Sequence, residues 1–230
     1  MILAMDTSSR ICTVALAGDE GILAEFSLGI ARAHSRWLVP ALSTLLDDTG
    51  TTPDNVHAIA VTTGPGSFTG LRIGITTAKM LAYVWGVPVC PVDTLQVLAC
   101  GLVTAMPVSP VVMARKGQVY AALYEEERCR CKPHVADEGE WFQYLVSLAQ
   151  PVLVVGDALE RGELLHRERL SGLLESAPIS VSYPRAAVVA QMGLAAFNQG
   201  RTVDPFVLRA HYLAKSQAEI VRERKMGRGE

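Results

Sequence analysis

The chain has 230 residues, of which half are apolar and 19% are charged, and its formal net charge is −2. This composition excludes a disordered chain and is typical of a folded globular protein. The length suffices for one large domain or two small lobes. The small net charge excludes a general electrostatic attraction to nucleic acid, because freestanding RNA-binding domains are usually basic.

The sequence shows no pattern typical of a targeting or membrane segment. The first residues are apolar and then acidic, without the basic start of a signal peptide, and no apolar run approaches the roughly 20 residues of a membrane span. The five cysteines are odd in number and scattered, which favours reduced thiols in a cytoplasmic protein. Cys129, Cys131 and His134 lie close together, but their spacing matches no zinc pattern, so we expect no metal site.

The first half of the chain alternates strand-like and helical patterns. Strands are predicted over residues 2–6, 11–17, 22–28, 58–62 and 87–92. The first three are joined by short polar turns, which indicates an antiparallel meander. Apolar residues at helical spacing predict helices over 33–48 and 68–85. The second of these helices connects two strands, and such a βαβ unit predicts a parallel pair with a right-handed crossover.

The second half repeats that order less regularly. Helices are predicted over 94–105, 138–148 and 185–198, and strands over 110–114, 118–125, 129–135 and 151–155. Two successive blocks of meander and βαβ type indicate a duplicated α/β architecture with its boundary near residues 105–110. We therefore expect an N-terminal lobe over 1–106 and a C-terminal lobe over 107–230. This duplication rests on element order, because no repeat is visible in the sequence itself.

The turn after the first predicted strand, Asp6-Thr7-Ser8-Ser9, is rich in hydroxyls and backbone donors. Such a turn can hold the phosphates of a nucleotide, with Asp6 reaching a magnesium ion through water. The alternative is an ordinary polar turn, since Asp, Thr and Ser are common in hairpins. Asp6, Thr7 and Ser8 are therefore weak candidates for phosphate binding.

A second candidate loop is the glycine-rich stretch from Gly64 to Gly70. It follows a strand and opens a helix, where backbone N–H groups and the helix dipole favour anions. It is not a P-loop, because the lysine and the following hydroxyl residue are missing. Gly64, Gly66 and Ser67 are thus further candidates for phosphate binding. The alternative is that the glycines only let the helix and the strand pack closely.

The two helices of the first half carry more apolar surface than one contact needs. In the helix over 68–85, Met80 and Val84 belong to a second apolar face beside the first. A helix that covers one side of a sheet needs a single apolar stripe, so the second face favours contact with another subunit. The predicted partner surface consists of Leu38, Leu42, Leu45, Leu71, Ile75 and Ala78. The alternative is burial of these faces within the chain.

Four motifs in this sequence resemble the bacterial TsaB family, also called YeaZ. They are LAMDTSS at 3–9, His34-Ser35 with Leu38 and Pro40, GPGSFTGLRIG at 64–74, and RKGQVY at 115–120. The resemblance is most specific at 64–74 and extends to about residue 125; beyond it, the element order, Val155-Gly156-Asp157 and a tail around 205–213 fit. It implies the family's actin-like (ASKHA, ribonuclease H-like) α/β fold, with duplicated lobes of mixed sheets flanked by helices.

The resemblance also implies a role in forming threonylcarbamoyladenosine beside the anticodon of tRNA. TsaB-like proteins pair with the related TsaD, which transfers the threonylcarbamoyl group to the tRNA base, and the small ATPase TsaE joins that pair. Members also form homodimers through helices that correspond here to 33–48 and 68–85. The resemblance therefore implies a scaffold subunit with no cofactor of its own, with ATP and a divalent metal serving the complex, and with tRNA contact only through the complex.

A non-catalytic role is also indicated by what replaces the metal ligands of TsaD. TsaD relatives carry a His-x-x-x-His pair after the strand that follows the glycine-loop helix, and two histidines at this spacing face one metal. Thr94 and Leu98 occupy these positions here, and no other histidine pair has the spacing. Within the TsaB pattern, Met113 stands where relatives often have Asp, so a polar role is not expected there.

Two other functions compete with the scaffold interpretation. An independent ATP-dependent phosphotransferase of the same fold would need a second phosphate loop, for which Gly156-Asp157 is a weak candidate. A peptidase ranks last, because the metal pair is absent and no catalytic triad order stands out. The basic residues of the tail either contact RNA phosphates in the complex or form a solvated end; they are Arg222, Arg224, Lys225 and Arg228.

Overall fold

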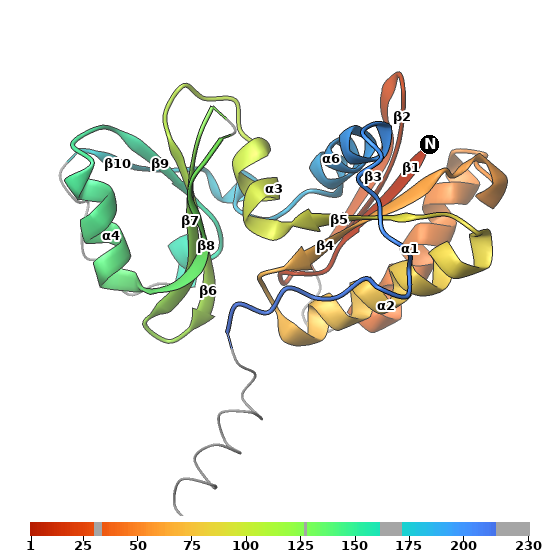
Figure 1. Cartoon of the computed structure of the whole chain (residues 1–230), viewed down its shortest axis with the longest axis horizontal. Helices are drawn as coiled ribbons and strands as arrows, with labels where there is room; N and C mark the ends of the chain where they lie inside the picture. The colour runs from red at the N-terminus through yellow and green to blue at the C-terminus, as the bar shows by residue number, and fades with distance from the viewer. Residues whose placement is uncertain (30–33, 127, 162–171, 215–230) are drawn as a thin grey trace, which may run out of the picture.

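The computed structural model describes residues 1–29, 34–126, 128–161 and 172–214. They form two lobes, each built on a five-stranded sheet, that lie side by side in Figure 1. The first sheet contains β1 (Ile2–Asp6), β2 (Cys12–Gly18), β3 (Gly21–Leu28), β4 (Ala58–Gly64) and β5 (Val89–Asp93). Its strand order is β3-β2-β1-β4-β5, with an antiparallel meander on one side and the parallel strands β1, β4 and β5 on the other.

The second sheet repeats this order. It contains β6 (Val108–Arg115), β7 (Gln118–Glu125), β8 (Arg128–Asp137), β9 (Val152–Val155) and β10 (Leu174–Ser176), in the order β10-β9-β6-β7-β8. Strands β6, β7 and β8 are an antiparallel meander, and β9 and β10 extend the sheet in parallel with β6. The predicted duplicated fold is therefore confirmed.

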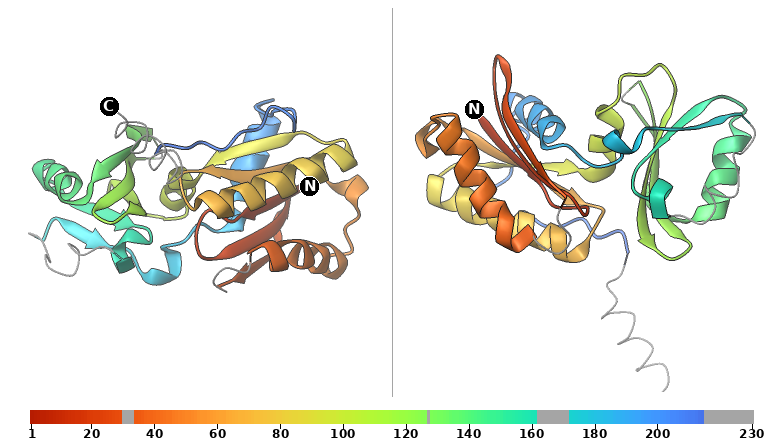
Figure 2. Two further views of the ribbon diagram at one scale, coloured as in Figure 1. Left: turned by 90° about the horizontal axis from the view of Figure 1, so that it is seen from below. Right: turned by 180° about the vertical axis from the view of Figure 1, so that it is seen from behind.

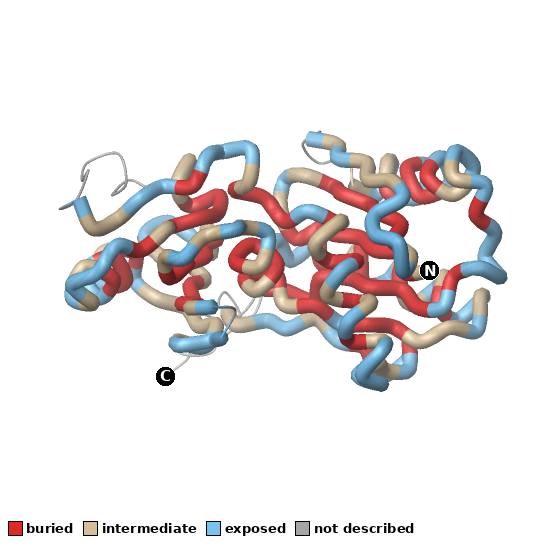
Figure 3. Tube along the Cα trace, turned by 90° about the horizontal axis from the view of Figure 1, so that it is seen from above, coloured by how far each residue is buried: buried red, intermediate tan, exposed pale blue. Residues whose placement is uncertain are grey.

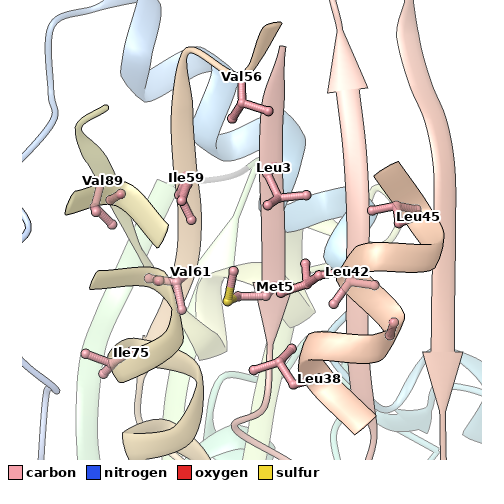
Figure 4. Close-up of a cluster of buried hydrophobic side chains, with 14 of the residues drawn as sticks. Leu3, Met5, Leu38, Leu42, Leu45, Val56, Ile59, Val61, Ile75 and Val89 are labelled. Atoms are coloured by element: carbon pink, nitrogen blue, oxygen red, sulfur yellow. The ribbon is translucent and has the colours of Figure 1, made fainter. Parts of the chain in front are cut away.

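Strand register decides which side chains of the first sheet meet which helices. Leu3 pairs with Leu16 and Ile59, and Met5 with Val14 and Val61, so these side chains share one face. That face packs against α1 (His34–Asp48) and α2 (Phe68–Trp85), as Figure 4 shows. Helix α2 begins at Ser67, whose Oγ accepts a hydrogen bond from Gly70 N, and ends at Gly86 in the left-handed conformation.

The opposite face of the first sheet is lined mostly by alanines and packs against α6 (Ala186–Asn198). The small side chains let the helix approach closely. A Cβ atom added to Gly193 of α6 would lie within 3 Å of the Ala60 side chain. Helix α6 follows the second sheet in sequence but covers the first one, and Figure 2 shows it behind β1 and β2.

The second lobe is covered by α4 (Glu138–Ser147) on one face and by α3 (Thr94–Cys100) on the other. Helix α3 also contacts β4, β5 and α6, so it joins the two lobes. Between β9 and β10 lies α5 (Ala158–Arg161), and two short 3₁₀ helices span Pro53–Asn55 and Ile179–Val181. The buried segments follow the strands through the middle of both lobes in Figure 3.

The structure differs most from the sequence-based elements at α3, α5 and β10. Helix α3 ends at Cys100, five residues earlier than predicted, and α5 and β10 were not predicted. The predicted boundary after residue 106 lies in the connection between α3 and β6, and the division into two domains stays a prediction. Among the described helices, none has the length and hydropathy required to cross a membrane.

Candidate functional site

The two loops singled out in the sequence lie against each other at the carboxyl ends of β1 and β4. Ser67 N donates a hydrogen bond to Ser8 O at 2.7 Å, and Thr7 Oγ1 donates to Gly70 O at 2.7 Å. Asp6, Thr7, Ser8 and Gly64 are buried, Gly66 is half-buried and Ser67 is exposed. The structure thus brings all six predicted phosphate-binding residues together.

Asp6 is held inside the protein rather than presented to solvent. Its Oδ1 accepts hydrogen bonds from Ser8 N at 3.2 Å, Ser8 Oγ at 2.6 Å and Thr62 Oγ1 at 2.5 Å. Its Oδ2 is buried and has no hydrogen-bond partner among the described residues. Burial raises the pKa of this carboxyl, and the hydrogen bonds from Ser8 and Thr62 oppose that rise only partly. In this arrangement Asp6 ties β1 to β4.

The glycines of the second loop permit its close approach to the first. A Cβ atom at Gly66 would lie within 3 Å of Ser8 O, and one at Gly70 within 3 Å of Thr7 O. Gly64 has a φ of 120°, and a Cβ atom there would lie 2.7 Å from His211 O. These contacts favour the alternative given above, in which the glycines serve packing. Phosphate binding by this loop pair stays a prediction.

The corresponding connection of the second lobe also serves packing. Asp157 Oδ1 accepts a hydrogen bond from Met113 N at 2.8 Å. Gly156 has a φ of 129°, and a Cβ atom there would lie within 3 Å of Val111 O. Gly156 and Asp157 therefore fasten the end of β9 to β6. The backbone of Met113 takes part in this contact, although its side chain is apolar.

Thr94 and Leu98, the two positions that the resemblance to TsaD singled out, are both buried. Thr94 is 1% exposed and Leu98 is 2% exposed. Leu98 packs with Val108 and Val112 of the second sheet, where the two lobes meet. Among the described residues, no group of three or more His, Cys, Asp or Glu side chains is placed to hold a metal ion. Cys131 Sγ lies 3.9 Å from His134 Nδ1.

The structure buries the six residues of the predicted partner surface. Leu38, Leu42, Leu45, Leu71, Ile75 and Ala78 are all at most 7% exposed and belong to the core beneath α1 and α2. They contact the first sheet. These residues are therefore buried within the chain, which is the alternative given above, and they are not available to a partner in this structure. The sequence could not decide which of the two apolar faces of α2 meets the sheet.

Other apolar residues of the same two helices remain at the surface. Val39 of α1 is 58% exposed, and in α2 the values are 58% for Met80, 62% for Tyr83 and 70% for Val84. We call these four exposed residues the helix-pair patch; Val39 lies near the start of α1, the other three lie near the end of α2, and the Tyr83 ring is 5.3 Å from that of Phe206. Met80 and Val84 belong to the second apolar face that the sequence indicated, whereas Tyr83 and Val39 were missed. The sequence feature that could have identified Tyr83 and Val39 is their position outside the apolar stripe that packs on the sheet.

The helix pair has charge of opposite sign at its two ends. Both helices start beside the same loop, because His34 Nε2 lies 2.9 Å from Ser9 O and Ser67 N bonds Ser8 O. Arg36 and Arg72 are exposed near these starts, whereas Asp47 and Asp48 are exposed at the end of α1. A second helix pair laid antiparallel on this surface would bring opposite charges together if it had the same distribution.

Two lobes with one mixed-sheet strand order, each flanked by helices, define the actin-like (ASKHA) class of proteins. A family model described as TsaD, tRNA N6-adenosine threonylcarbamoyltransferase, matches residues 9–220. The tRNA threonylcarbamoyladenosine biosynthesis protein TsaB of Bacillus subtilis is 34% identical over 178 residues, which are 75% of this chain and 76% of that protein. The chain belongs to the TsaB family.

Further relatives agree with this assignment. TsaB of Escherichia coli K12 is 36% identical over 159 residues, which cover 61% of this chain and 68% of that protein. A crystal structure of a Pseudomonas aeruginosa protein, described as uncharacterized with similarity to peptidase YEAZ, superposes with a TM-score of 0.79 at 27% identity. That match covers 93% of this chain and 99% of the other, so the likeness includes both lobes.

Proposed function

We propose that this chain is a non-catalytic subunit in the synthesis of threonylcarbamoyladenosine on tRNA, and that it acts by pairing with TsaD in the cytoplasm. The observation that carries the proposal is that Thr94 and Leu98 are buried, with Leu98 in an apolar cluster, at the positions where the resemblance implies a metal-binding histidine pair in TsaD. Relatives that share most of the chain are named for this biosynthesis. ATP and the divalent metal belong to the partners, and TsaE joins the pair.

The helix-pair patch is the surface that supports pairing. Exposed apolar and aromatic side chains are typical anchors of protein interfaces, and the patch lies on two neighbouring helices that are held rigidly on the first sheet. TsaD is related in sequence to this chain, so it offers an equivalent helix pair. The same surface fits a homodimer, because a two-fold axis would place Arg36 opposite Asp47 and Asp48 of the second copy.

Charged substitutions at an exposed and at a buried position of α1 distinguish a loss of TsaD binding from a loss of folding. Val39→Glu places a charge on the helix-pair patch, and we expect loss of the TsaD complex on size-exclusion chromatography with an unchanged thermal unfolding transition. Tyr144→Glu introduces the same charge at a 41% exposed position of α4 in the second lobe and serves as the matched control. Retention of the TsaD complex by both Val39→Glu and Met80→Glu would exclude this surface.

Leu42→Glu acts on the opposite side of α1. Leu42 is 4% exposed in the core, so the charge would be buried without a partner and the chain should unfold. Loss of the TsaD complex in this variant would therefore report misfolding, and circular dichroism identifies it.

The alternative, an independent ATP-dependent phosphotransferase, has less support. Such an enzyme needs a carboxylate that reaches the metal and a second phosphate loop. Asp6 is fully buried and bonded to Ser8 and Thr62, and Asp157 is bonded to the backbone of β6. ATP hydrolysis by the isolated chain, unaffected by TsaD, would favour the phosphotransferase over the scaffold.

A further inference from the structure

A strap formed by residues 203–212 returns from α6 to the first lobe and runs along α2. Val203 and Val89 exchange two backbone hydrogen bonds, of 2.8 and 3.0 Å, at the edge of the first sheet. Leu208 is 3% exposed and belongs to the core beneath α2. At its end, His211 N donates to Thr63 O at 2.7 Å. The strap is thus fixed at three points between the sheet edge and the start of α2.

An aromatic and arginine cluster lies where the strap meets the start of α2. The Arg72 guanidinium carbon is 3.9 Å from the centre of the Phe68 ring, and the Phe68 and Tyr212 rings are 5.0 Å apart. Arg72 Nε donates to Tyr212 Oη at 3.4 Å. Phe68 is 38% exposed and Tyr212 is 44% exposed. Both side chains therefore remain partly at the surface although they contact each other.

The seam between α2 and the strap is positively charged. Arg209 donates to the carbonyl oxygens of Phe206 and Leu208, and Lys79 Nζ donates to Leu208 O at 3.2 Å. Backbone carbonyls do not neutralise these charges. Within the described ranges, no ion pair is formed by Arg72, Lys79 or Arg209. The chain as a whole has a net charge of −2, so this concentration of cations is local.

We propose that this cluster, Phe68, Arg72 and Tyr212 with Arg209, binds an unpaired loop of RNA. Unpaired bases stack on exposed aromatic rings and on arginine planes, and cations beside them contact the phosphates. The inference rests on the proposed function, since the substrate of the complex is then a tRNA modified beside its anticodon. It adds a direct contact between this chain and that loop, where the sequence analysis expected tRNA contact only through the complex.

A protein partner is the competing occupant, because arginine and aromatic residues also anchor protein interfaces. Charge favours RNA. Arg72, Lys79 and Arg209 are cations, and the acid of the strap, Asp204, lies at its far end, where Oδ1 accepts a hydrogen bond from Phe206 N. A row of cations attracts a polyanion and makes its binding depend on salt.

The test measures binding of an unmodified tRNA transcript, with a fluorescent label, to the full chain alone and to its complex with TsaD. Tyr212→Ala should weaken binding about tenfold, because one stacking contact is lost. Tyr212→Phe keeps the ring and should stay within about twofold of the wild type. Arg72→Gln should weaken binding and lower the slope of log affinity against log salt by about one.

Matched controls lie elsewhere on the molecule. Tyr144→Ala removes a similarly exposed ring from α4, and Arg201→Gln removes an exposed charge whose Nε bonds Gln199; both should bind the transcript like the wild type. Wild-type affinity in Tyr212→Ala and Arg72→Gln would overturn the inference. Loss of the TsaD complex in these variants, with transcript binding by the chain alone unchanged, would assign the cluster to the protein interface and also overturn it.

Failure of the proposed function gives a different result. In that case the wild-type chain does not associate with TsaD in the absence of RNA. Transcript binding by the chain alone still decides the inference, because the five variants and the wild type are compared without any partner.

Discussion

The first and second sheets have the same strand order, but the connection after the fourth strand differs between them. In the first lobe, β4 leads through the glycine loop into the 18 residues of α2; in the second, β9 leads through Gly156 and Asp157 into α5, which the structure describes over Ala158–Arg161. The first sheet also has two helices on one face and α6 on the other. The second sheet shares α3 with the first lobe and has α4 to itself.

Comparing the two lobes shows which features accompany the shared strand order in both lobes and which occur in the first lobe. Both lobes have a glycine after the fourth strand where a side chain would meet backbone: Gly66 lies against Ser8 O in the loop after β1, and Gly156 against Val111 O of β6. In the first lobe the glycine loop leads into the 18-residue helix α2. The exposed helix-pair patch and the aromatic and arginine cluster both depend on that helix, so the surfaces proposed for partner and RNA lie on the first lobe.

The largest expected effect comes from adding a methyl group where the two loops of the first lobe touch. Gly70→Ala would place a Cβ atom against Thr7 O, which cannot move without shifting β1, so we expect a loss of about 3 kcal/mol in the free energy of unfolding. Urea unfolding followed by circular dichroism measures it. Gly29→Ala is the control, because a Cβ atom there meets nothing within 4 Å. Equal stability of the two variants would contradict the close packing of the loops.

The same test applies to the second lobe. Gly156→Ala combines a close approach to Val111 O with a φ of 129° that side chains rarely adopt. We expect a destabilisation of about 3 kcal/mol here as well, measured in the same way. A much smaller effect than at Gly70 would show that the second lobe tolerates changes at this connection, and the two lobes would then differ in how tightly the connection is packed.

A smaller effect is expected at the junction of the lobes. Leu98→Ala removes apolar contacts between α3 and the second sheet, and we expect a loss of about 2 kcal/mol, at the low end for a buried leucine. Thermal unfolding by calorimetry measures the change. The transition should stay single if α3 is part of both cores, and two separated transitions would contradict that role.

The buried carboxyl of the first lobe predicts a dependence on pH. Burial raises the pKa of Asp6 in the folded chain above its value in the unfolded chain, so the folded state binds the proton more tightly. This contribution to stability is complete below the unfolded pKa, about 4, and is lost as the pH rises through the folded pKa. Asp6→Asn cannot titrate. The difference in free energy of unfolding between Asp6→Asn and the wild type should therefore shift in favour of the variant as the pH rises.

Urea unfolding at several pH values checks the prediction for Asp6. Asp54→Asn, at an exposed position of the 3₁₀ helix over Pro53–Asn55, is expected to follow the wild type throughout. A stability difference between Asp6→Asn and the wild type that does not change with pH would mean that the carboxyl titrates alike in the folded and unfolded chains.

The smallest effect is expected from the ion pair that connects the two lobes at the surface. Arg10 Nη2 lies 2.9 Å from Glu160 Oε2, and Tyr183 Oη donates to Glu160 Oε1 at 2.7 Å. The Arg10 side chain is 56% exposed, so Glu160→Gln should change the free energy of unfolding by less than about 1 kcal/mol. A double-mutant cycle with Arg10→Met measures the coupling, and a value of several kcal/mol would make this pair a principal connection of the lobes.

The sequence predicted most of the fold because its periodic patterns are long. Helix α2 and the two meanders follow from apolar spacing and turn residues over many positions. Strand β10 has three residues, too few for any period to be recognised. The early end of α3 depends on tertiary contacts, because the residues after Cys100 connect the lobes.

The candidate site was predictable in part. Motif positions identified both loops of the first lobe, but the bond from Thr62 to Asp6 joins residues 56 positions apart and has no sequence signal. The partner surface was assigned to the apolar stripe with the strongest pattern, and such a stripe is the one that packs on the sheet. The cluster of Phe68, Arg72 and Tyr212 depends on the path of the strap, which the sequence did not indicate.

The most direct test of the central claim is reconstitution of tRNA threonylcarbamoylation with purified components, measured by mass spectrometry of the modified nucleoside. The account predicts no product from this chain with the threonylcarbamoyl donor and tRNA, product when TsaD and TsaE are added, and loss of that product with Val39→Glu but not with Tyr144→Glu. Product formed by this chain without TsaD, or full activity of TsaD and TsaE without this chain, would contradict it.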